Sequence, residues 1–503
     1  MPFVISLLLV FISQLLIAQE SVLQFSISSS PSRVNPLLAT DSASSEIADR
    51  LFNGLVKFDK TGKIVGDLAD LYYFENNTTL IFKLRQGVKW HDGEKFDAED
   101  VVYTYALLQS PKLLTPYKDS FKHVKNVEAL SDYEVKVTYK QPYFKALSIW
   151  MMGILPKHLW EKESDPMTSK LNKLPIGTGA YMLTKAFKVN ERIVLEANPY
   201  YLPHPPFIKT INYHYIADPS TQFITLKAQE LDIGSLDPLQ VERQLDNKFK
   251  DYYKLIEQAS HSYTYLGFNL RKEKFKDRRV REAIAYAINK QELIDLLFFS
   301  HGEACHGPFM PRSSVYPTDY QPKGYDPKRS KALLKELGFS SSHPLVFEVV
   351  TNTGNDIRIN AAQIIQHQLA KVGIVMHIRT MEWQAFLNTI VMPHNFESVL
   401  MGWSLSFIPD AYSIWHSDGN KKGGFNFIGY HNSKVDHHIL KAEKIIDPDR
   451  FAKEYQKIFK YIADDTPYIF LYIPNSITAI NKKIQGVEPS LMGIMHNQIE
   501  WKK

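Results

Sequence analysis

The sequence contains a single cysteine, Cys305, among its 503 residues. One thiol cannot form a disulfide within the chain, and a zinc site built from several cysteines is excluded as well. We expect Cys305 to pack as a small hydrophobic residue. The composition otherwise favours a folded protein, because 44% of the residues are hydrophobic and this excludes general disorder. The length allows two or three domains of roughly 150 residues each.

The sequence also lacks a strong charge imbalance. It has 59 basic and 54 acidic residues, a formal net charge of +5, and its basic residues are scattered along the chain. No basic run is interleaved with aromatic residues, so nucleic acid is not an expected partner and a mixed, solvated surface is predicted.

Catalytic and cofactor-binding motifs are absent. The patterns GxxxxGK[ST], GxSxG and HExxH do not occur, and no GxGxxG follows a predicted strand. Adjacent carboxylates such as Glu99–Asp100 and Asp464–Asp465 would point about 100° apart on a helix and do not converge. We therefore predict no catalytic residue and no cofactor, which leaves a secreted peptidase or hydrolase as the weakest functional alternative.

The one long apolar run is Met1–Ala18. It is short for a membrane span, which needs about 20 residues, and it resembles a signal peptide cleaved after Ala18. The run starts without Lys or Arg, and Leu16 is large for its position before the cleavage site, so an uncleaved anchor is the alternative. No lipid-anchoring cysteine follows, which predicts a soluble periplasmic protein.

Residues 80–105, LIFKLRQGVKWHDGEKFDAEDVVYTY, are the most informative stretch. Alternation from Leu80 to Arg85, with Ile81, Lys83 and Arg85 on one face, predicts a half-buried strand. His91-Asp92-Gly93 predicts a turn, because Gly accepts positive φ and Asp bonds to its own backbone. Asp97 then predicts the N-cap of a helix that runs through Val101 to Leu108.

Further motifs follow this stretch in order along the chain. They are Gly177–Tyr181 (GTGAY), Asn198–Tyr201 (NPYY), Leu226–Ile233 (LKAQELDI), Tyr265–Asn269 (YLGFN) and Phe275–Ala287 (FKDRRVREAIAYA). Together they resemble the family 5 extracellular solute-binding proteins, the dipeptide, oligopeptide and nickel receptors of ABC importers. Gln229 stands where this family usually has glycine.

The resemblance implies an α/β fold of the type II periplasmic binding protein class, with two main lobes, a hinge and a smaller extra lobe. In these terms 1–18 is the signal peptide, and lobe I is discontinuous, comprising 19–42, 170–258 and 474–503. Lobe II is then 43–169 and lobe III is 259–473. A lobe built from separate segments requires several chain crossings, which predicts the hinge.

Periodicity within the third region predicts helices and strands. Apolar residues fall on one helix face at Val280, Ala283, Ile284, Ala287 and Ile288. A helix over 359–372 is followed by a stop at Gly373 and a strand over 374–379, which predicts an α/β crossover unit. The continuous apolar run Tyr468–Ile473 predicts another strand.

The resemblance places the ligand-binding segment at Met401–Trp415 (MGWSLSFIPDAYSIW). Trp403 takes the family tryptophan position and offers a rigid apolar wall with one N–H. Peptide-binding relatives have an aspartate three residues later to neutralise the peptide ammonium, whereas this chain has Ser406. Asp410 could supply that charge or could be a turn residue after Pro409. The candidate ligand-binding residues are Trp403, Ser406, Asp410, Tyr412, Trp415, Asn352 and His496.

A second departure concerns the ligand carboxylate. Dipeptide receptors carry an arginine just before the helix that corresponds to residues 359–372, and this arginine binds the peptide carboxylate. Here residues 351–356 read TNTGND, with no arginine before Arg358. A receptor restricted to dipeptides is therefore disfavoured, and longer peptides, which are held through their backbone, are favoured.

The 17 histidines raise the nickel alternative. His496, in the C-terminal segment, and His416 are the candidate metal ligands, because imidazole suits nickel and one histidine plus a chelating small molecule would suffice. No HxH or HxxxH pair places two ligands on one element, and His437-His438 are adjacent and diverge. The main hypothesis is a monomeric receptor that closes on an oligopeptide or other small solute and delivers it to ABC permease subunits.

Overall fold

The computed structural model describes residues 21–421 and 424–503, and the predicted signal peptide at residues 1–18 lies outside them. The chain divides into two compact units. Unit 1 comprises residues up to Leu236, Asp246–Ile256 and Thr478–Lys503, whereas unit 2 comprises Asp237–Leu245 and Glu257–Ile477. The chain therefore passes between the units four times. The further division of unit 1 into lobes I and II stays a prediction.

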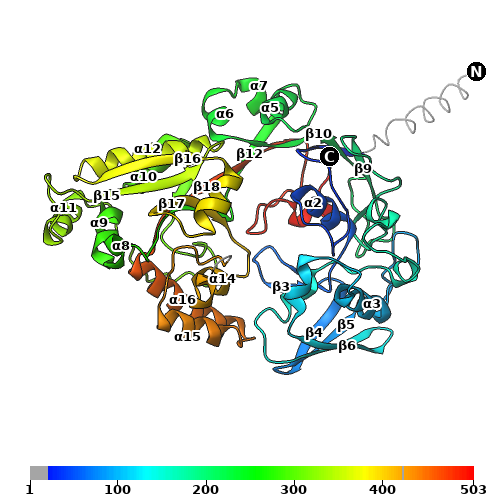
Figure 1. Cartoon of the computed structure of the whole chain (residues 1–503). Coiled ribbons are helices and arrows are strands. Elements are labelled where there is room, and N and C mark those ends of the chain that lie inside the picture. The colour runs from blue at the N-terminus through cyan, green and yellow to red at the C-terminus, as the bar shows by residue number, and fades with distance from the viewer. Residues whose placement is uncertain (1–20, 422–423) are drawn as a thin grey trace, which may run out of the picture. The chain divides into compact units, whose positions relative to one another are not determined.

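Unit 1, in the part that the structure describes, contains two four-stranded sheets and a hairpin (Figure 1). The first sheet has the order β1 (Val22–Ile27), β10 (Thr210–Tyr215), β9 (Ile193–Ala197) and β8 (Tyr181–Met182). The second has the order β4 (Ala69–Asn76), β5 (Thr79–Leu84), β7 (Glu134–Tyr139) and β6 (Val124–Ser131). The hairpin pairs β2 (Val56–Phe58) with β3 (Ile64–Gly66).

The run from β5 to α3 (Ala98–Gln109) has the predicted strand, turn and helix. Asp97 caps the helix and forms a capping box with Asp100, which satisfies backbone N–H groups that have no partner within the helix. The prediction of a half-buried strand was wrong at Ile81, which is 1% exposed beside the buried Leu80 and Phe82. Tyr73 on β4 and Lys136 on β7 stand opposite Ile81 in register, and their long side chains flank it on the same face of the sheet.

Three of the sequence motifs meet in unit 1. His91, in the turn after β5, accepts a hydrogen bond from the Gly177 N–H to Nδ1 at 3.1 Å and donates from Nε2 to the Gly179 carbonyl at 3.1 Å. Asn198, which is fully buried, donates to the same Gly179 carbonyl at 2.9 Å. The conformation of the GTGAY segment is thus fixed by the HDG turn and by the NPYY segment.

The remaining regular elements of unit 1 cover its sheets and connect them. They are α2 (Ser42–Leu51), η1 (Pro116–Phe121), η2 (Ser148–Met151), α4 (Lys157–Trp160), η3 (Lys170–Asn172), α5 (Pro219–Lys227), β11 (Ile233–Leu236), α7 (Asn247–Tyr252), the start of β12 (Tyr253–Ala259) and η6 (Met495–Glu500). Gln229, after α5, has φ +64°, a conformation that glycine adopts without strain, which explains why the family usually has glycine there.

Unit 2 is built on a sheet with helices on both faces. Its strands are β13 (Ser262–Phe268), β17 (Ser398–Ser404), β15 (Val346–Asn352), β16 (Val375–Met381), β14 (Gly302–Ala304) and β18 (Tyr468–Asn481), whose last residues belong to unit 1. Tyr265, Val399 and Phe470 belong to one buried cluster. Their chain neighbours Leu266, Leu400 and Leu471 belong to another. Because successive strand residues point to opposite faces, the two clusters lie on opposite faces of the sheet, which explains the continuous apolar run in β18.

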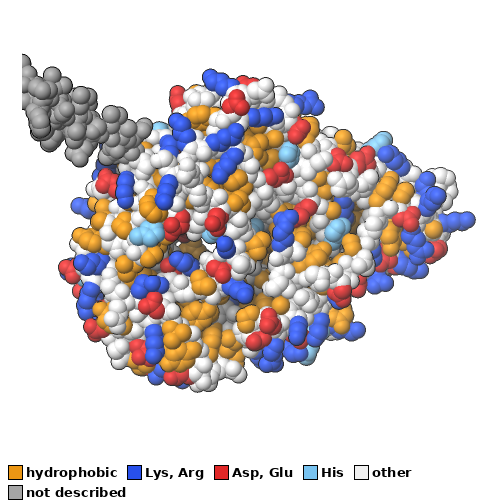
Figure 2. Space-filling model, turned by 180° about the vertical axis from the view of Figure 1, so that it is seen from behind, with side chains coloured by type: hydrophobic (Ala, Val, Ile, Leu, Met, Phe, Trp, Pro, Cys, Tyr) orange, Lys and Arg blue, Asp and Glu red, His pale blue; other side chains and the backbone are white. Residues whose placement is uncertain are grey.

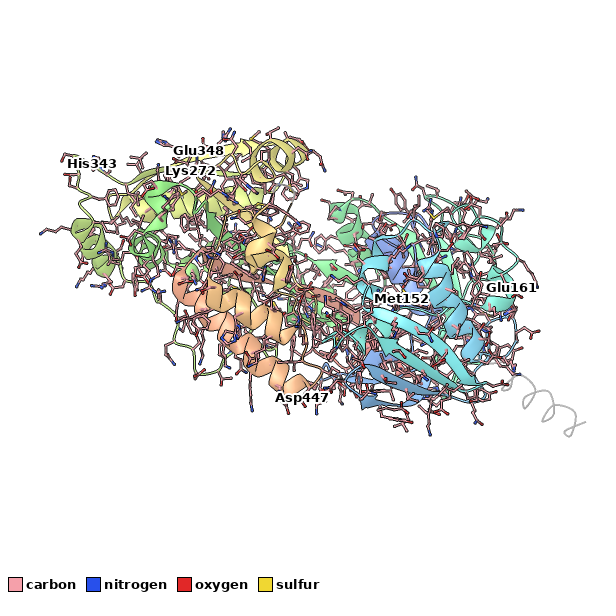
Figure 3. All side chains as sticks on the ribbon, turned by 60° about the horizontal axis from the view of Figure 1, so that its bottom comes forward. Met152, Glu161, Lys272, His343, Glu348 and Asp447 are labelled. Atoms are coloured by element: carbon pink, nitrogen blue, oxygen red, sulfur yellow. The ribbon has the colours of Figure 1, made fainter. Side chains whose placement is uncertain are left out.

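The helices of unit 2 supply both covers. They are α6 (Pro238–Arg243), α8 (Glu273–Lys276), α9 (Arg278–Ala287), α10 (Lys290–Phe298), α11 (Pro327–Glu336), α12 (Asp356–Ala370), α13 (Trp383–Phe386), η4 (Leu387–Val391), α14 (Tyr412–Trp415), η5 (Ser417–Asn420), α15 (Ser433–Ala442) and α16 (Pro448–Asp465). Figure 3 labels Asp447, the N-cap of α16, and Glu348 on β15. β15 and β16 are parallel and joined through α12, with Gly373 at φ +86° between them, so the predicted crossover is confirmed.

The predicted packing roles of Cys305 and of the α9 stripe are confirmed. Cys305 is a free, buried thiol, and the five apolar positions of the stripe are all at most 5% exposed. The visible face in Figure 2 carries acidic and basic side chains side by side, with neither sign gathered into one region. Within residues 21–421 and 424–503, no helix has the length and apolarity that a membrane crossing requires.

Candidate functional site

Trp403 lies near the carboxyl end of β17 and is half-buried. Its ring lies nearly parallel to that of Tyr265 on the adjacent β13, with centroids 6.5 Å apart and an interplanar angle of 7°. It also stacks on Phe427, with centroids 5.6 Å apart and an angle of 12°. Aromatic neighbours therefore hold the indole in one orientation, which makes it a rigid wall.

Several buried polar atoms around Trp403 form no hydrogen bond of good geometry with a described residue, although the Tyr468 hydroxyl lies close enough to the side chains of Tyr265 and Trp403 to interact with them. These atoms are Trp403 Nε1, the hydroxyl oxygens of Tyr263, Tyr265 and Tyr468, and Arg358 Nε. The Tyr265 and Tyr468 rings stack with centroids 3.8 Å apart. A buried donor without an acceptor costs about 1–3 kcal/mol, so a concentration of such atoms points to a bound molecule or water as the missing partner.

The tyrosines of this group are neutral hydrogen-bond donors at physiological pH. Burial raises the pKa of Tyr265 well above its usual value. Burial also raises the pKa of Tyr468 to about 12, while the Tyr265 and Trp403 side chains act in the opposite direction. Each hydroxyl can therefore donate to a carbonyl or carboxylate oxygen of a bound solute.

Arg358 is the residue that sequence reasoning missed. It lies in the first turn of α12, and NH1 reaches back to Asn352 Oδ1 at 2.6 Å. A side chain at Gly402, the residue before Trp403, would place its Cβ 3.3 Å from Arg358 NH2, so the guanidinium lies over β17. Burial lowers the Arg358 pKa, although a guanidinium stays charged in proteins. Arg358 thus links Asn352, a predicted site residue, to the β17 backbone next to Trp403.

Polar side chains in the loop after Trp403 form hydrogen bonds within the protein. Ser406 is exposed, and its hydroxyl donates to the Ile408 carbonyl at 2.6 Å. Asp410 Oδ1 accepts from the Tyr412 N–H at 3.1 Å, the arrangement expected of a turn residue. The Tyr412 hydroxyl donates to Asp418 Oδ2 at 2.9 Å. Ligand contacts from these three residues stay a prediction.

Trp415 and His416 lie in the core of unit 2. Trp415 is 2% exposed and packs on Tyr468, with ring centroids 4.8 Å apart. His416 is 6% exposed, and its Nδ1 accepts from the Asp418 N–H at 3.1 Å. Its Nε2 is buried. The structure thus gives both residues packing contacts, and nickel binding by His416 would require its Nε2 to become accessible.

His496 belongs to unit 1 and is half-buried. Its Nδ1 lies 3.2 Å from the Gly493 carbonyl oxygen and 3.0 Å from Ser490 Oγ. A carbonyl can only accept, so Nδ1 carries the proton and the Nε2 lone pair is available. This is the tautomer that a metal-binding imidazole adopts. No group of three or more His, Cys, Asp or Glu side chains able to hold a metal occurs in the described part of the chain.

The candidate residues of unit 2 are arranged as in α/β proteins that bind a ligand at the carboxyl ends of their strands. β15 and β17 are parallel, and Asn352 and Trp403 lie at or near their carboxyl ends, where α/β sheets bind ligands. An aromatic wall, buried donors and one guanidinium can hold a solute without chemical change. The predicted α/β fold of the type II periplasmic binding class is confirmed by the structural comparisons below.

Comparison with known proteins identifies the family. Residues 63–425 match the profile "Bacterial extracellular solute-binding proteins, family 5 Middle". The chain is 32% identical over 490 residues to the oligopeptide-binding protein AppA of Bacillus subtilis, covering 94% of this chain and 89% of that protein. This chain belongs to the family 5 bacterial extracellular solute-binding proteins.

Two solved structures support the same assignment. AppA of Bacillus subtilis in complex with a nonapeptide is 31% identical, with a TM-score of 0.74 and coverage of 95% of this chain and 98% of that chain. NikZ of Campylobacter jejuni in complex with Ni(L-His) is 27% identical, with a TM-score of 0.77 and coverage of 96% and 100%. Both resemble this chain over nearly its whole length.

Proposed function

We propose that this protein binds oligopeptides and delivers them to the permease of an ABC importer. The observation that carries the proposal is the group of buried donors beside Trp403 that lack a hydrogen bond of good geometry to a described residue. Extended peptides present carbonyl oxygens at regular intervals, and such acceptors would satisfy the Trp403 indole and the tyrosine hydroxyls. The likeness to AppA with its bound nonapeptide supports a ligand of this length class.

Arg358 extends this proposal to the charge of the peptide. Its guanidinium is desolvated, and it donates through Nη1 to the neutral side chain of Asn352. A carboxylate of the peptide, at its terminus or on an acidic side chain, would provide a charged partner. The opposite end of the peptide, its ammonium group, would be served by Asp410, the first carboxylate after Trp403 in the sequence.

The proposal makes the protein a monomeric receptor rather than an enzyme, located in the periplasm after removal of the predicted signal peptide. The four passages of the chain between the units suit a hinge, because a few residues at each passage can absorb the change in backbone angles. The permease would then recognise the closed, peptide-bound state.

Binding of a peptide should raise the stability of the protein. At a peptide concentration 100-fold above Kd, the free energy of unfolding should increase by about 2.7 kcal/mol. The purified protein is first unfolded and refolded to remove any bound peptide. Its thermal unfolding is then measured in the presence of peptide libraries of defined length, and native mass spectrometry identifies the peptide that stays bound. Absence of any shift across all of these peptide libraries would contradict the proposal.

Substitution of Arg358 sharpens this test. Arg358→Gln should weaken binding of the selected peptide about 10-fold, because a charge-assisted hydrogen bond is lost. Arg379→Gln is the matched control, since Arg379 is partly exposed and pairs with Glu348 at 3.1 Å on the edge of the sheet. Equal loss in both variants would show that Arg358 does not contact the peptide.

A nickel chelate is the second candidate, favoured by the available Nε2 of His496 and by the likeness to NikZ with bound Ni(L-His). In that case His496→Ala should lower the affinity for nickel–histidine at least about 100-fold, since the protein ligand is lost. Isothermal titration with Ni(L-His)2 measures this effect, and His343→Ala, on an exposed loop of unit 2, is the control. Unchanged affinity in His496→Ala would remove this candidate.

A further inference from the structure

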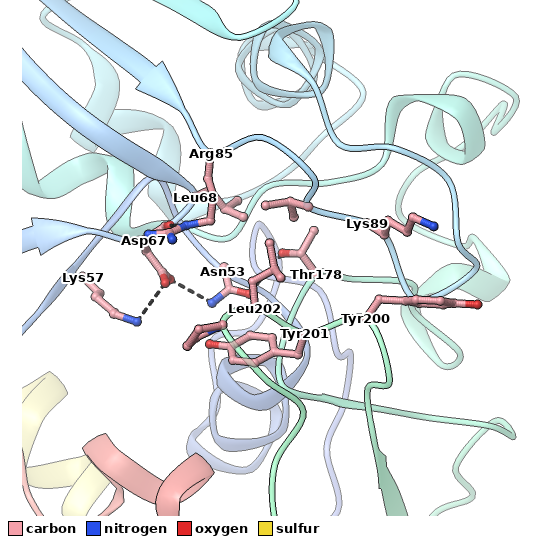
Figure 4. A pocket seen from close by; sticks show the side chains of 12 residues that line it. Asn53, Lys57, Asp67, Leu68, Arg85, Lys89, Thr178, Tyr200, Tyr201 and Leu202 are labelled. Atoms are coloured by element: carbon pink, nitrogen blue, oxygen red, sulfur yellow. Dashed lines mark hydrogen bonds and ion pairs between the residues drawn. The ribbon is translucent and has the colours of Figure 1, made fainter.

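Unit 1 contains a cavity of about 240 Å³ that shares no residue with the candidate site (Figure 4). The lining residues come from the segments around β2, before β4 and after β5, and from the NPYY segment and the residues after it, together with Thr178. They are Asn53, Lys57, Asp67, Leu68, Arg85, Val88, Lys89, Thr178 and Tyr200–Pro203. All of these residues belong to unit 1. The volume equals that of about eight water molecules, which is enough for a molecule the size of one amino acid.

The charged residues of the lining are three cations and one carboxylate. Asp67 accepts from Lys57 Nζ at 2.9 Å and from Asn53 Nδ2 at 2.8 Å, so this carboxylate is already satisfied. Arg85 NH2 pairs with Asp70, which does not line the cavity, at 3.0 Å. The lining therefore has a positive excess, and a cation would be repelled.

Lys89 is the cation that this arrangement leaves unneutralised. Its Nζ lies 5.2 Å from the centroid of the Tyr200 ring, and no carboxylate of a described residue forms an ion pair with it. Lys89 is exposed, and Figure 4 shows it beside Tyr200, at the other side of the cavity from Lys57 and Asp67. A flexible lysine at this rim can reach an anion that enters the cavity.

The wall between these charges is apolar. Tyr200 is 43% exposed and Leu202 is 38% exposed, although both are large and hydrophobic, and Leu68, Val88 and Pro203 complete the surface. Binding of an apolar group against this wall would be stabilised by about 25 cal/mol for each Å² of apolar surface removed from water. Inorganic phosphate would leave it wet, so a purely inorganic anion fits poorly.

We propose that this cavity is an accessory binding site for a small organic monocarboxylate, with its carboxylate at Lys89 and its apolar body against Tyr200 and Leu202. The site is separate from solute transport and does not depend on the oligopeptide proposal. It assigns to unit 1 a ligand of its own, of amino-acid size.

The test compares an acid with its neutral isostere on the full chain. By calorimetry, 3-phenylpropanoate should bind with one-to-one stoichiometry and a Kd on the order of 1 mM, as expected for a ligand of this size. Its amide, 3-phenylpropanamide, should bind at least about 5-fold more weakly, because only the acid can pair with a lysine. Equal binding of acid and amide, or no binding of either, would overturn the proposal.

Variants locate the bound acid. Lys89→Gln should weaken acid binding about 5-fold without changing amide binding, and Leu202→Trp should abolish both by filling the cavity. Lys83→Gln is the matched control, since Lys83 is an exposed lysine of β5 outside the lining. Arg358→Gln should leave the binding of 3-phenylpropanoate unchanged, whatever its effect on peptide binding. Loss of acid binding in Arg358→Gln but not in Lys89→Gln would place the acid in unit 2 and overturn the proposal, whatever the fate of peptide binding.

Discussion

Gly177→Ala is expected to destabilise unit 1 by at least about 3 kcal/mol, because overpacking against backbone cannot be relieved by a side-chain rotation. A Cβ at Gly177 would overlap the carbonyl oxygen of Leu51, at the end of α2, and would lie 2.7 Å from the carbonyl carbon. The same glycine exchanges two hydrogen bonds with His91, through its N–H at 3.1 Å and its carbonyl at 2.9 Å. Movement away from Leu51 would therefore disturb the HDG turn.

Urea denaturation followed by tryptophan fluorescence measures this loss. Gly324→Ala is the control, because a Cβ at Gly324 meets no atom within 4 Å and its φ is not positive, so its effect should lie within about 0.5 kcal/mol of zero. A change of less than about 1 kcal/mol for Gly177→Ala would show that α2 and the GTGAY segment can separate without cost.

The second large effect is a dependence of stability on pH through His91. Burial lowers the pKa of this imidazole to about 4, whereas an unfolded histidine titrates near 6.5. Between pH 6.5 and about 4, His91 is protonated in the unfolded chain but stays neutral in the folded chain. The contribution of His91 is thus complete above about pH 6.5 and is lost as the pH falls toward about 4, by about 3 kcal/mol in all. The geometry agrees, since a proton on Nδ1 would face the Gly177 N–H.

Urea denaturation at several pH values tests this effect as a difference between variants. His91→Gln should remove about one proton from the slope of stability against pH between about 4.5 and 6, and His343→Gln, on an exposed loop, is the control. The difference is needed because burial raises the pKa of Asp100 to about 6. The folded state therefore gains a proton at Asp100 as the pH falls, and this contribution to the stability of the wild type opposes that of His91. Identical slopes in His91→Gln and wild type would contradict the prediction.

Sequence reasoning identified the family because its motifs have local causes. The capping box at Asp97, the positive φ of Gly93 and Gly373 and the apolar stripe of α9 depend on residues within a few positions of one another. Such local patterns can be recognised in a sequence without knowledge of the fold. The resemblance that they carried also led to the prediction that Trp403 contacts the ligand.

The candidate site was predicted less completely. Trp403 and Asn352 were named, whereas Arg358 was mentioned only as the first arginine after residues 351–356 and was not named as a site residue. Its guanidinium reaches Asn352 because the first turn of α12 follows β15 after a short loop, a geometry that the sequence does not state. Trp415, by contrast, was expected to face the ligand, and the structure packs its ring on Tyr468.

The sequence by itself determined the family, the turn and helix after β5, the crossover through α12 and the absence of a cysteine framework. Only the tertiary structure decided that His91 is a buried link between the HDG and GTGAY segments, that Arg358 bridges Asn352 and β17, and that a cavity opens beside Lys89. The reason is physical: caps, turns and periodicity arise between near neighbours, whereas these three features join residues that strand pairing and packing bring together from distant parts of the chain.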